Sequence, residues 1–394
     1  MNKTALHLLL IVTLLSSISA RTFGQKIFEK EYILSIMQKV NKYQLAYLWT
    51  LKNDYNWIRG TYYTGVMACY QKTGDKTFLK QCLNWGKEHD WKVAPREWMD
   101  EGGANPLTCA QTWLECYKFK GQKKMIEDVQ VVLADPVRLK TPASNPEKWF
   151  YEGGRIYVDA LYVGAPVLAM LYNITGDEKY LKTLDHFYWT VVNTLYDKDL
   201  HLFYRDTTFI QNPNGNNIKY DACTLAGARG GKLLERQISV FDKKVVWARG
   251  NGWALGSLVR VIKYLPENTP SRQRYISLFK EFAEGVKNAQ SPDGYWHVNL
   301  DDAKEFPNPE SSGTGFFVYG LAWGINSGYL DASKYSDTVK RGWIALHNTV
   351  NKDGKVQWGQ MVGHSPAYVV KEDSHEYVTG TFLLAASEVY QLKQ

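Results

Sequence analysis

The sequence predicts an all-α protein, an (α/α)6 barrel of about twelve helices with a small β insertion around residues 197–248. The first observation is a recurring pattern of an apolar helical stretch, a Gly-containing turn and an amphipathic stretch, as in residues 69–83, 116–129 and 171–184. Gly at a helix C-terminus supplies the left-handed conformation that ends the helix, and a following Asp caps the next one. Such turns, mostly at intervals of roughly 50–60 residues, indicate stacked αα-hairpins.

The second observation is that the two helices of each hairpin differ in composition. The helix before each turn is rich in Ala, Gly, Leu, Val and Tyr, as expected when most faces are buried, whereas its partner carries the Lys and Glu of a solvated face. The predicted buried helices are 59–72, 107–120, 157–174, 250–265, 313–326 and 375–392. Alternation of buried and amphipathic helices suggests a closed double ring. An open solenoid is the competing architecture, and only closure separates the two.

The N-terminus has the pattern of a secretory signal peptide. Lys3 precedes an apolar run over residues 5–15, small polar residues follow, and no acid occurs before Glu29. The run is too short to span a bilayer, and no later stretch is apolar enough to do so. We therefore expect residues 1–24 to be removed and residues 25–394 to form one barrel domain that is exported, either to the periplasm or to the medium.

Composition excludes several classes of protein. The chain has 394 residues, 45% hydrophobic and 22% charged, so wholesale disorder is excluded. Its 47 Lys and Arg residues are scattered rather than clustered, so no nucleic-acid partner is expected. Five Cys residues show no metal-ligand spacing, and buried free thiols are the expectation for them. No HExxH, GxSxG or Walker motif occurs, and the sequence does not indicate an oligomeric state.

Polar and aromatic residues gather where the predicted buried helices begin. These residues are Trp57, Arg59, Asn105, Gln111, Tyr157, Asp159, Trp247, Arg249, Asn251, Trp253, Ser312, Thr314 and His375. If the buried helices run parallel, these positions converge on one mouth, where six helix N-termini create a positive field. Arg supplies charge pairing and Trp supplies ring stacking. The mouth therefore suits a small anionic ring molecule, such as a uronic acid.

Two of these residues have competing interpretations. Asp159 is either a general acid/base whose protonation is set by partial burial, or a structural residue that caps its helix or is hydrogen-bonded within the fold. Arg249, beside two Trp and two Gly residues in WARGNGW, is either a fixed charge on an open surface or a structural cation. The Gly250-Asn251-Gly252 spacing resembles a phosphate loop, but no strand–turn–helix unit surrounds it, so dinucleotide binding is not expected.

Several motifs together resemble glycoside hydrolase family 105, the unsaturated rhamnogalacturonyl or glucuronyl hydrolases. The resemblance covers the chain from about residue 30 to its end, and WARGNGW and ESSGTGFF are its most specific parts. The stretches that carry it are 158–177, 195–206, 247–262, 293–300 and 309–331. It implies an (α/α)6 barrel, in agreement with the repeat pattern.

The resemblance also implies an activity. Enzymes of this family act on oligosaccharides left by polysaccharide lyases, whose terminal uronate carries a C4=C5 double bond. An Asp protonates C4 and helps water add at C5, and no metal or organic cofactor is needed. By motif position Asp159 matches this Asp, while Arg249 and Trp253 match the substrate-contacting segment, with Arg249 suited to the carboxylate. The implied partner is an anionic oligosaccharide of rhamnogalacturonan or ulvan type.

Further substrate contacts are expected from Trp247, Asn251, Tyr157, Arg59, Gln111, Arg205 and Thr314. The chain departs from the family pattern in three places. Asn105-Pro106 stands where many relatives have an Asp pair, so Asp100 or Glu101 is a possible second carboxylate. Arg205 in LFYRD replaces a His of some relatives, and residues 215–241 form a longer insertion.

Two alternatives to the uronyl hydrolase follow from these departures. An ordinary anomeric glycosidase on the same fold would use Asp159 with Asp100, Glu101 or Glu310. A catalytically idle uronide-binding barrel is the other alternative, and Asn105-Pro106 motivates it.

Overall fold

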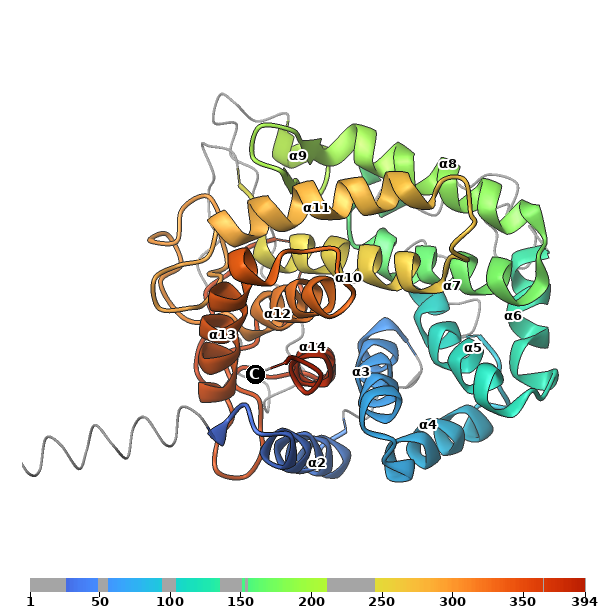
Figure 1. Cartoon of the computed structure of the whole chain (residues 1–394), viewed down its shortest axis with the longest axis horizontal. Helices are drawn as coiled ribbons and strands as arrows, with labels where there is room; N and C mark the ends of the chain where they lie inside the picture. Colours follow the sequence, from blue (N-terminus) through green and yellow to red (C-terminus); the bar gives the residue numbers. More distant parts are fainter. Residues whose placement is uncertain are drawn as a thin grey trace, which may run out of the picture.

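The fold is a double ring of helices. A computed structural model describes residues 26–48, 56–93, 104–134, 151–152, 155–210, 245–363 and 365–393. The inner helices are α3 (Trp57–Thr73), α5 (Thr108–Lys120), α7 (Ala160–Thr175), α10 (Ala248–Tyr264), α12 (Ser311–Asn326) and α14 (Glu376–Val389). The outer helices are α2 (Lys30–Ala46), α4 (Lys76–Glu88), α6 (Lys124–Ala134), α8 (Glu178–Leu195), α11 (Arg272–Asn288) and α13 (Ala332–Asn348). Figure 1 shows the outer helices surrounding the inner ones.

The inner ring is closed. Each inner helix packs against the next in chain order, and α14 packs against α3, so that the last and first inner helices lie side by side (Figure 1). At this seam Arg59 of α3 forms a bidentate ion pair with Glu376 of α14, with N–O distances of 2.8 and 3.0 Å. Closure confirms the (α/α)6 barrel and excludes the open solenoid.

The turn chemistry expected from the sequence is present. Gly74 and Gly176 end α3 and α7 with φ of 73° and 69°, a left-handed backbone conformation that residues other than glycine rarely adopt. Asp75 and Asp177 then accept hydrogen bonds from backbone N–H groups of the next helix, α4 or α8. The repeat pattern therefore predicts both the helix ends and the hairpin connections correctly.

Strands are few among the described residues. β1 (Tyr151–Glu152) pairs with β2 (Arg155–Ile156), and β3 (Tyr196–Asp197) pairs with β4 (Leu202–Phe203), both antiparallel. A 3-10 turn, η2 (Asn105–Leu107), precedes α5, and a short helix, α9 (Thr207–Ile210), follows β4. The predicted β insertion thus begins as one small hairpin. Its continuation, including the insertion over residues 215–241, lies outside the described residues.

Other expectations are settled only in part. Residues 1–24 lie outside the described part, so the signal peptide stays a prediction. Cys69, Cys82, Cys109 and Cys116 are buried free thiols, as expected, while Cys223 is not described. In the described ranges no helix is long and apolar enough to cross a membrane, and no group of acidic, His and Cys side chains could hold a metal ion.

Candidate active site

An open cavity lies at the N-terminal end of the inner ring, with about 510 Å³ of empty space that includes adjoining solvent. Trp57 is the first residue of α3, Asp159 is the N-cap of α7, and Arg249 and Trp253 belong to the first two turns of α10. The complete lining is Trp57, Asn105, Tyr157, Asp159, Val163, Arg205, Arg249, Trp253, Val362 and Gly363. The inner helices therefore do bring the predicted acid and the predicted guanidinium to one mouth.

Asp159 presents its carboxylate to this cavity rather than to its own helix. It occupies the N-cap position of α7, but its side chain makes no capping hydrogen bond, and the backbone oxygen accepts from Tyr162 N at 3.0 Å. The side chain is 18% exposed, and its Oδ2 lies 3.4 Å from Nε of Arg205. The carboxylate is thus partly shielded from water, oriented by a cation and open to a ligand, which is the environment that a general acid/base needs. The side chain therefore does not cap α7, and its role as the acid/base stays a prediction.

Arg205 contacts Asp206 and Tyr157 while its Nε faces Asp159. Its Nη1 donates to Oδ2 of Asp206 at 2.8 Å, and its guanidinium lies 5.4 Å from the ring centre of Tyr157. The backbone fixes the same geometry, because Val158 N donates to Arg205 O at 2.8 Å and Tyr157 pairs with Asp206 in an antiparallel bridge. The segment before α7 and the segment after β4 are therefore joined side by side.

Arg249 is a buried cation with an unusual set of partners. Its guanidinium is 1% exposed and donates to the backbone oxygens of Gln360, Met361 and Gly363 and to the hydroxyl of Tyr377. All four acceptors are uncharged, and no carboxylate of the described residues forms an ion pair with it. It also lies 4.5 Å above the ring of Trp247. A buried positive charge that lines a cavity without a counter-ion favours an anionic ligand.

Aromatic rings form a wall of the cavity. Trp57 and Trp253 meet edge to face with ring centres 5.9 Å apart, and Trp57 also contacts Tyr377 at 5.3 Å. Gly252 of the WARGNGW motif has a packing cause, because a Cβ at this position would come within 2.9 Å of the Phe316 ring. Close approach of α12 to α10 therefore explains this glycine, and a phosphate loop is not needed to explain it.

Three predicted substrate contacts bond to the scaffold instead. Gln111 donates to Tyr162 O at 2.7 Å, and its Oε1 accepts from Nε of Arg260. Asn251 bonds the backbone N and O of Phe203, which fixes β4 against α10. Thr314 donates to Glu310 O within α12. Each of these polar groups is buried and bonded to protein, and none lines the cavity.

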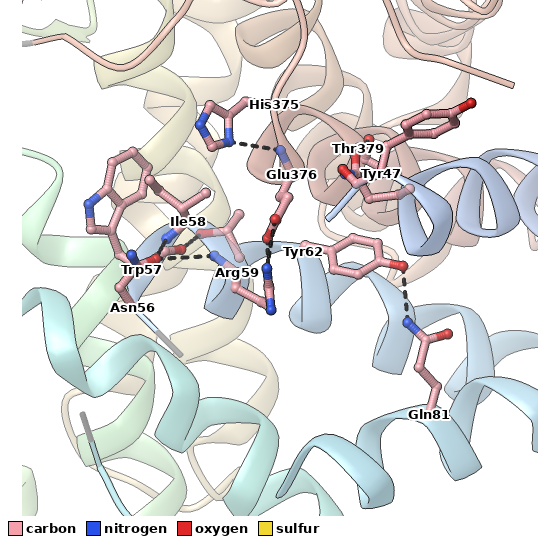
Figure 2. A network of polar contacts seen from close by, with 12 residues as sticks. Tyr47, Asn56, Trp57, Ile58, Arg59, Tyr62, Gln81, His375, Glu376 and Thr379 are labelled. Carbon is pink, nitrogen blue, oxygen red and sulfur yellow. Dashed lines mark hydrogen bonds and ion pairs between the residues drawn. The ribbon is translucent and has the colours of Figure 1, made fainter. Parts of the chain in front are cut away.

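Arg59 and Trp247 also lie behind the cavity surface. Arg59 pairs with Glu376 across the seam, and Figure 2 shows the two side chains pointing toward one another from α3 and α14. Trp247 donates from Nε1 to Oε1 of Gln360 at 2.8 Å and stacks on Arg249. Neither residue is among the described lining residues, and both contact residues around the cavity, so their direct contact with a substrate stays a prediction.

The carboxylates considered as partners of Asp159 divide into two cases. Glu310 is fully buried and caps α12, accepting from the N–H groups of Ser312 and Gly313 and also from Gln360 N, so it is a structural residue. Asp100 and Glu101 lie outside the described residues. Among the lining residues that the structure describes, Asp159 is the only carboxylate.

Sequence reasoning missed the loop that precedes α14. Val362 and Gly363 line the cavity, and the carbonyls of residues 360–363 hold Arg249. His375, the N-cap of α14, accepts from Glu376 N at 2.9 Å (Figure 2). Burial, followed by the charges of Arg249 and Arg59, lowers the pKa of His375 to about 3, so this imidazole is neutral at physiological pH. The loop carries no periodic signal by which the sequence could have revealed it.

A family model decides the relationship of this chain to known proteins. The model described as Glycosyl Hydrolase Family 88 matches residues 30–223 and 234–393. The chain belongs to this family. Two curated relatives are named unsaturated 3S-rhamnoglycuronyl hydrolase. The protein from Alteromonas sp. (strain LOR) is 32% identical over 84% of this chain and 77% of its own length. The protein from Formosa agariphila is 29% identical over the whole of both chains.

Solved structures support the same assignment. A family 88 glycosyl hydrolase from Bacteroides vulgatus is 29% identical and superposes with a TM-score of 0.74 over 92% of this chain and all of that one. A family 105 glycoside hydrolase from C. acetobutylicum, 21% identical, shares the fold with a TM-score of 0.67 over 90% of this chain and 99% of that one. The resemblance to unsaturated uronyl hydrolases predicted from the motifs is confirmed, and this member of family 88 is a glycoside hydrolase.

Proposed function

We propose that this family 88 hydrolase removes the 4,5-unsaturated uronic acid from the non-reducing end of lyase-generated oligosaccharides. One observation carries the proposal. The buried Arg249, whose partners within the described residues are all uncharged, lines the same cavity as Asp159. A uronate supplies the anion that the cavity favours, and its ring can stack on Trp57 or Trp253. The names of the curated relatives agree with this substrate class.

The reaction needs one group that gives a proton and takes one back. Asp159 donates its proton to C4, and a water molecule adds its oxygen to C5. The proton that this water loses returns to the Asp159 carboxylate, so the acid is regenerated. The hemiketal formed at C5 then opens by breaking the bond between C5 and the ring oxygen, which leaves a ketone at C5 and a hemiacetal at C1. The hemiacetal collapses to an aldehyde by breaking its bond to the glycosidic oxygen, and the neighbouring sugar is released together with the keto-uronate. The net change is the addition of one water molecule.

The geometry favours this chemistry over displacement at the anomeric carbon. An anomeric glycosidase places two carboxyl groups on opposite sides of the scissile bond, about 5–10 Å apart. In the described lining Asn105 occupies the wall where relatives of the predicted family have an acid, and Tyr157 Oη donates to its Oδ1 at 3.4 Å. Hydration across C4=C5 requires a single acid/base, which Asp159 provides.

The test is incubation with disaccharides made by rhamnogalacturonan or ulvan lyases, while the absorbance of the 4,5-double bond is followed. We expect the absorbance to fall with the wild type and to stay constant with Asp159→Asn. Constant absorbance across the whole panel contradicts the proposal. Turnover of saturated glycosides at a similar rate would favour the anomeric glycosidase. Tight binding of the disaccharide without turnover would favour an idle binding barrel.

We also propose that the substrate is of the rhamnoglycuronyl type and that the enzyme is exported. The first rests on the names of the two curated relatives and the second on the signal-peptide pattern of residues 1–24. Comparison of turnover on ulvan-derived and pectin-derived disaccharides tests the first. N-terminal sequencing of the protein from the periplasm or medium of its host tests the second.

A further inference from the structure

Gln360 is a buried glutamine in the loop before α14 that bonds to protein through each of its four polar atoms. The residue is 1% exposed. Its N–H donates to Oε1 of Glu310 at 3.1 Å, and its carbonyl oxygen accepts from Nη1 of Arg249 at 2.6 Å. Its side-chain Oε1 accepts from Nε1 of Trp247 at 2.8 Å, and its Nε2 donates to Ser365 O at 2.7 Å. A buried group bonded in this way has one favourable position, because any displacement leaves buried polar atoms without partners.

The side-chain amide of Gln360 fixes the segment that reaches the cavity. Its bond to Ser365 O joins residues 360 and 365, and its bond to Trp247 attaches the loop to the residue before α10. Val362 and Gly363 lie between these attachments along the chain and line the cavity. Gln360 itself is not among the described lining residues, so it shapes the wall without forming it.

The same amide also determines the surroundings of Arg249. The indole of Trp247 donates its N–H to Gln360, and the centre of its ring lies 4.5 Å from the Arg249 guanidinium. The carbonyl oxygens of Met361 and Gly363 accept from this guanidinium at 3.0 and 3.1 Å. One amide therefore holds both the ring against which Arg249 packs and the loop to which it donates. An arginine side chain has many rotamers, so such contacts decide where its charge lies.

We propose that Gln360 is a positioning residue for the carboxylate of the substrate, and that it acts on Arg249 through Trp247 and residues 361–363. The inference rests on the function proposed above, because it takes a uronate carboxylate as the ligand of Arg249. The acid/base belongs to a different segment, since Asp159 lies at the start of α7. Loss of the Gln360 amide should therefore weaken substrate binding and leave the chemical step nearly unchanged.

The backbone at this position has anchors that do not involve the side chain. Gly359 N donates to Asp373 O at 3.0 Å, and the N–H of Gln360 bonds to Glu310 whatever side chain residue 360 carries. Substitution of the side chain consequently removes the two bonds of the amide and keeps these backbone bonds. Its effect on the site can then be assigned to Trp247 and to the residues that follow Gln360.

The test is a double-mutant cycle in the full-length enzyme, measured by turnover of an unsaturated disaccharide. Gln360→Met keeps the approximate size of the side chain and removes both amide bonds. We expect its KM to rise about tenfold, with kcat within about twofold of the wild type. In the Arg249→Gln background the same change should alter KM by less than about twofold, because the cation that Gln360 positions is absent. Equal increases in both backgrounds, or an unchanged KM in the wild-type background, overturn the proposal.

Gln290→Met is a matched control in the outer ring. Gln290 follows α11 and donates from Nε2 to Gly294 O and Thr338 O, both at 3.0 Å. The control variant also loses two bonds from a side-chain amide, so it should lower the unfolding free energy and leave KM unchanged. A comparable rise of KM in the control would show that lost stability, and not the position of Arg249, explains the effect, and it would overturn the proposal.

Gln360→Glu is a second variant for the case that Gln360→Met does not fold. It keeps an oxygen that accepts from Trp247 Nε1, and it adds a negative charge beside the ring that contacts Arg249. This charge competes with the substrate carboxylate for the guanidinium, so KM should rise at least about tenfold. A wild-type KM in the folded Gln360→Glu enzyme overturns the proposal.

Failure of the proposed function has a different signature. It would appear in the wild type, as no turnover and no calorimetric binding of a saturated glucuronyl disaccharide. If that disaccharide binds without turnover, its Kd replaces KM in the same cycle. We then expect the same tenfold loss for Gln360→Met and little change in the Arg249→Gln background, and equal losses in both backgrounds overturn the proposal.

Discussion

The two ends of the inner ring carry similar residues in opposite circumstances. At the C-terminal end Arg260 of α10 lies 3.1 Å from Glu115 of α5, and Tyr264 donates to the same carboxylate. Lys72 of α3 lies 2.9 Å from Glu388 of α14. Cations at helix C-termini also complement the negative end of the helix dipole. At this end each of these buried or half-buried cations has a carboxylate partner on a neighbouring helix.

The N-terminal end differs in that its unmatched cation lines a cavity. Lys263 at the C-terminal end of α10 also donates to an uncharged group, Oε1 of Gln71, but it is not among the residues that line this cavity. The N-terminal end too has a matched seam pair, Arg59 with Glu376, but Arg249 has only uncharged partners in the described residues and faces a cavity. Burial of a charge is costly unless it is paired, so a protein keeps such a residue where a ligand completes the pair. The comparison indicates that the paired charges at the C-terminal end of the ring serve stability, and that the unmatched charge of Arg249 at the N-terminal end, the open end with the cavity, serves binding.

The largest effect is expected from the acid at the open end. Asp159→Asn should lower kcat about 10²- to 10⁴-fold, because the amide cannot give a proton to C4. The melting temperature should change little, since the side chain does not cap α7. Steady-state kinetics and thermal unfolding of the same preparation measure both quantities.

A matched control is Asp177→Ala at the start of α8. Asp177 does cap its helix, by accepting from Lys179 N at 3.0 Å. Its removal should lower the unfolding free energy and leave the activity of the folded enzyme unchanged. If Asp159→Asn unfolds the protein instead, Asp159 is a structural residue.

At the C-terminal end of the inner ring we expect Glu115→Gln to lower stability without changing activity, the opposite of Asp159→Asn. The variant leaves Arg260 buried without its carboxylate, which should cost about 3–5 kcal/mol of unfolding free energy. Activity per folded molecule should be unchanged, because the site lies at the other end of the ring. Chemical denaturation at neutral pH measures the first, and turnover corrected for folded fraction measures the second. An unchanged unfolding free energy with reduced turnover would remove the contrast between the two ends.

The two ends of the ring also differ in how much of their structure the sequence could predict. Repeat spacing, turn glycines and capping Asp residues are local signals, and they located the helices and the end at which the site lies. These signals do not fix how far each helix is rotated about its own axis, and this rotation decides which residues face the cavity. Residues 249 and 253 are one turn apart on the same face of α10, and both line the cavity, whereas Asn251 points away to β4.

Rotational position around the helix axis also explains why Trp57 lines the cavity and Arg59 does not. The two residues are two positions apart in sequence and about 200° apart around α3, so one lines the cavity and the other bonds to α14. Ring closure sets that phase, and closure depends on contacts between residues more than 300 positions apart. The loop over residues 360–363 has no periodicity at all. For these parts the three-dimensional structure was required.

A smaller effect is expected from the unmatched cation itself. Arg249→Gln should raise KM about 10- to 100-fold, since a charge-assisted hydrogen bond contributes about 1.5–3 kcal/mol. Arg249→Lys keeps the charge but loses part of the bonding to the 360–363 carbonyls, so its KM should lie between those of the wild type and the Gln variant. Unchanged KM values for both variants would show that Arg249 only holds the loop.

The smallest effect concerns the neutral His375 at the open end. Its pKa is about 3 in the folded protein because of burial and the nearby Arg249 and Arg59, against about 6.5 when unfolded. The unfolded chain therefore binds a proton that the folded protein does not. The stability that this difference contributes is fully present above pH 6.5 and is lost as the pH falls from there toward 3.

His375→Asn tests this sign. Asn also accepts a hydrogen bond at an N-cap, so the variant should match the wild type near pH 7.5 within about 1 kcal/mol. Between pH 6.5 and 4 its unfolding free energy should fall less steeply, by up to about 1.4 kcal/mol per pH unit. His375→Ala should show the same shallower slope but a lower value at every pH, because the cap is lost as well. If the wild-type and Asn curves fall in parallel, His375 is not held neutral by the charges at the mouth, and the positive field inferred for the open end is too strong.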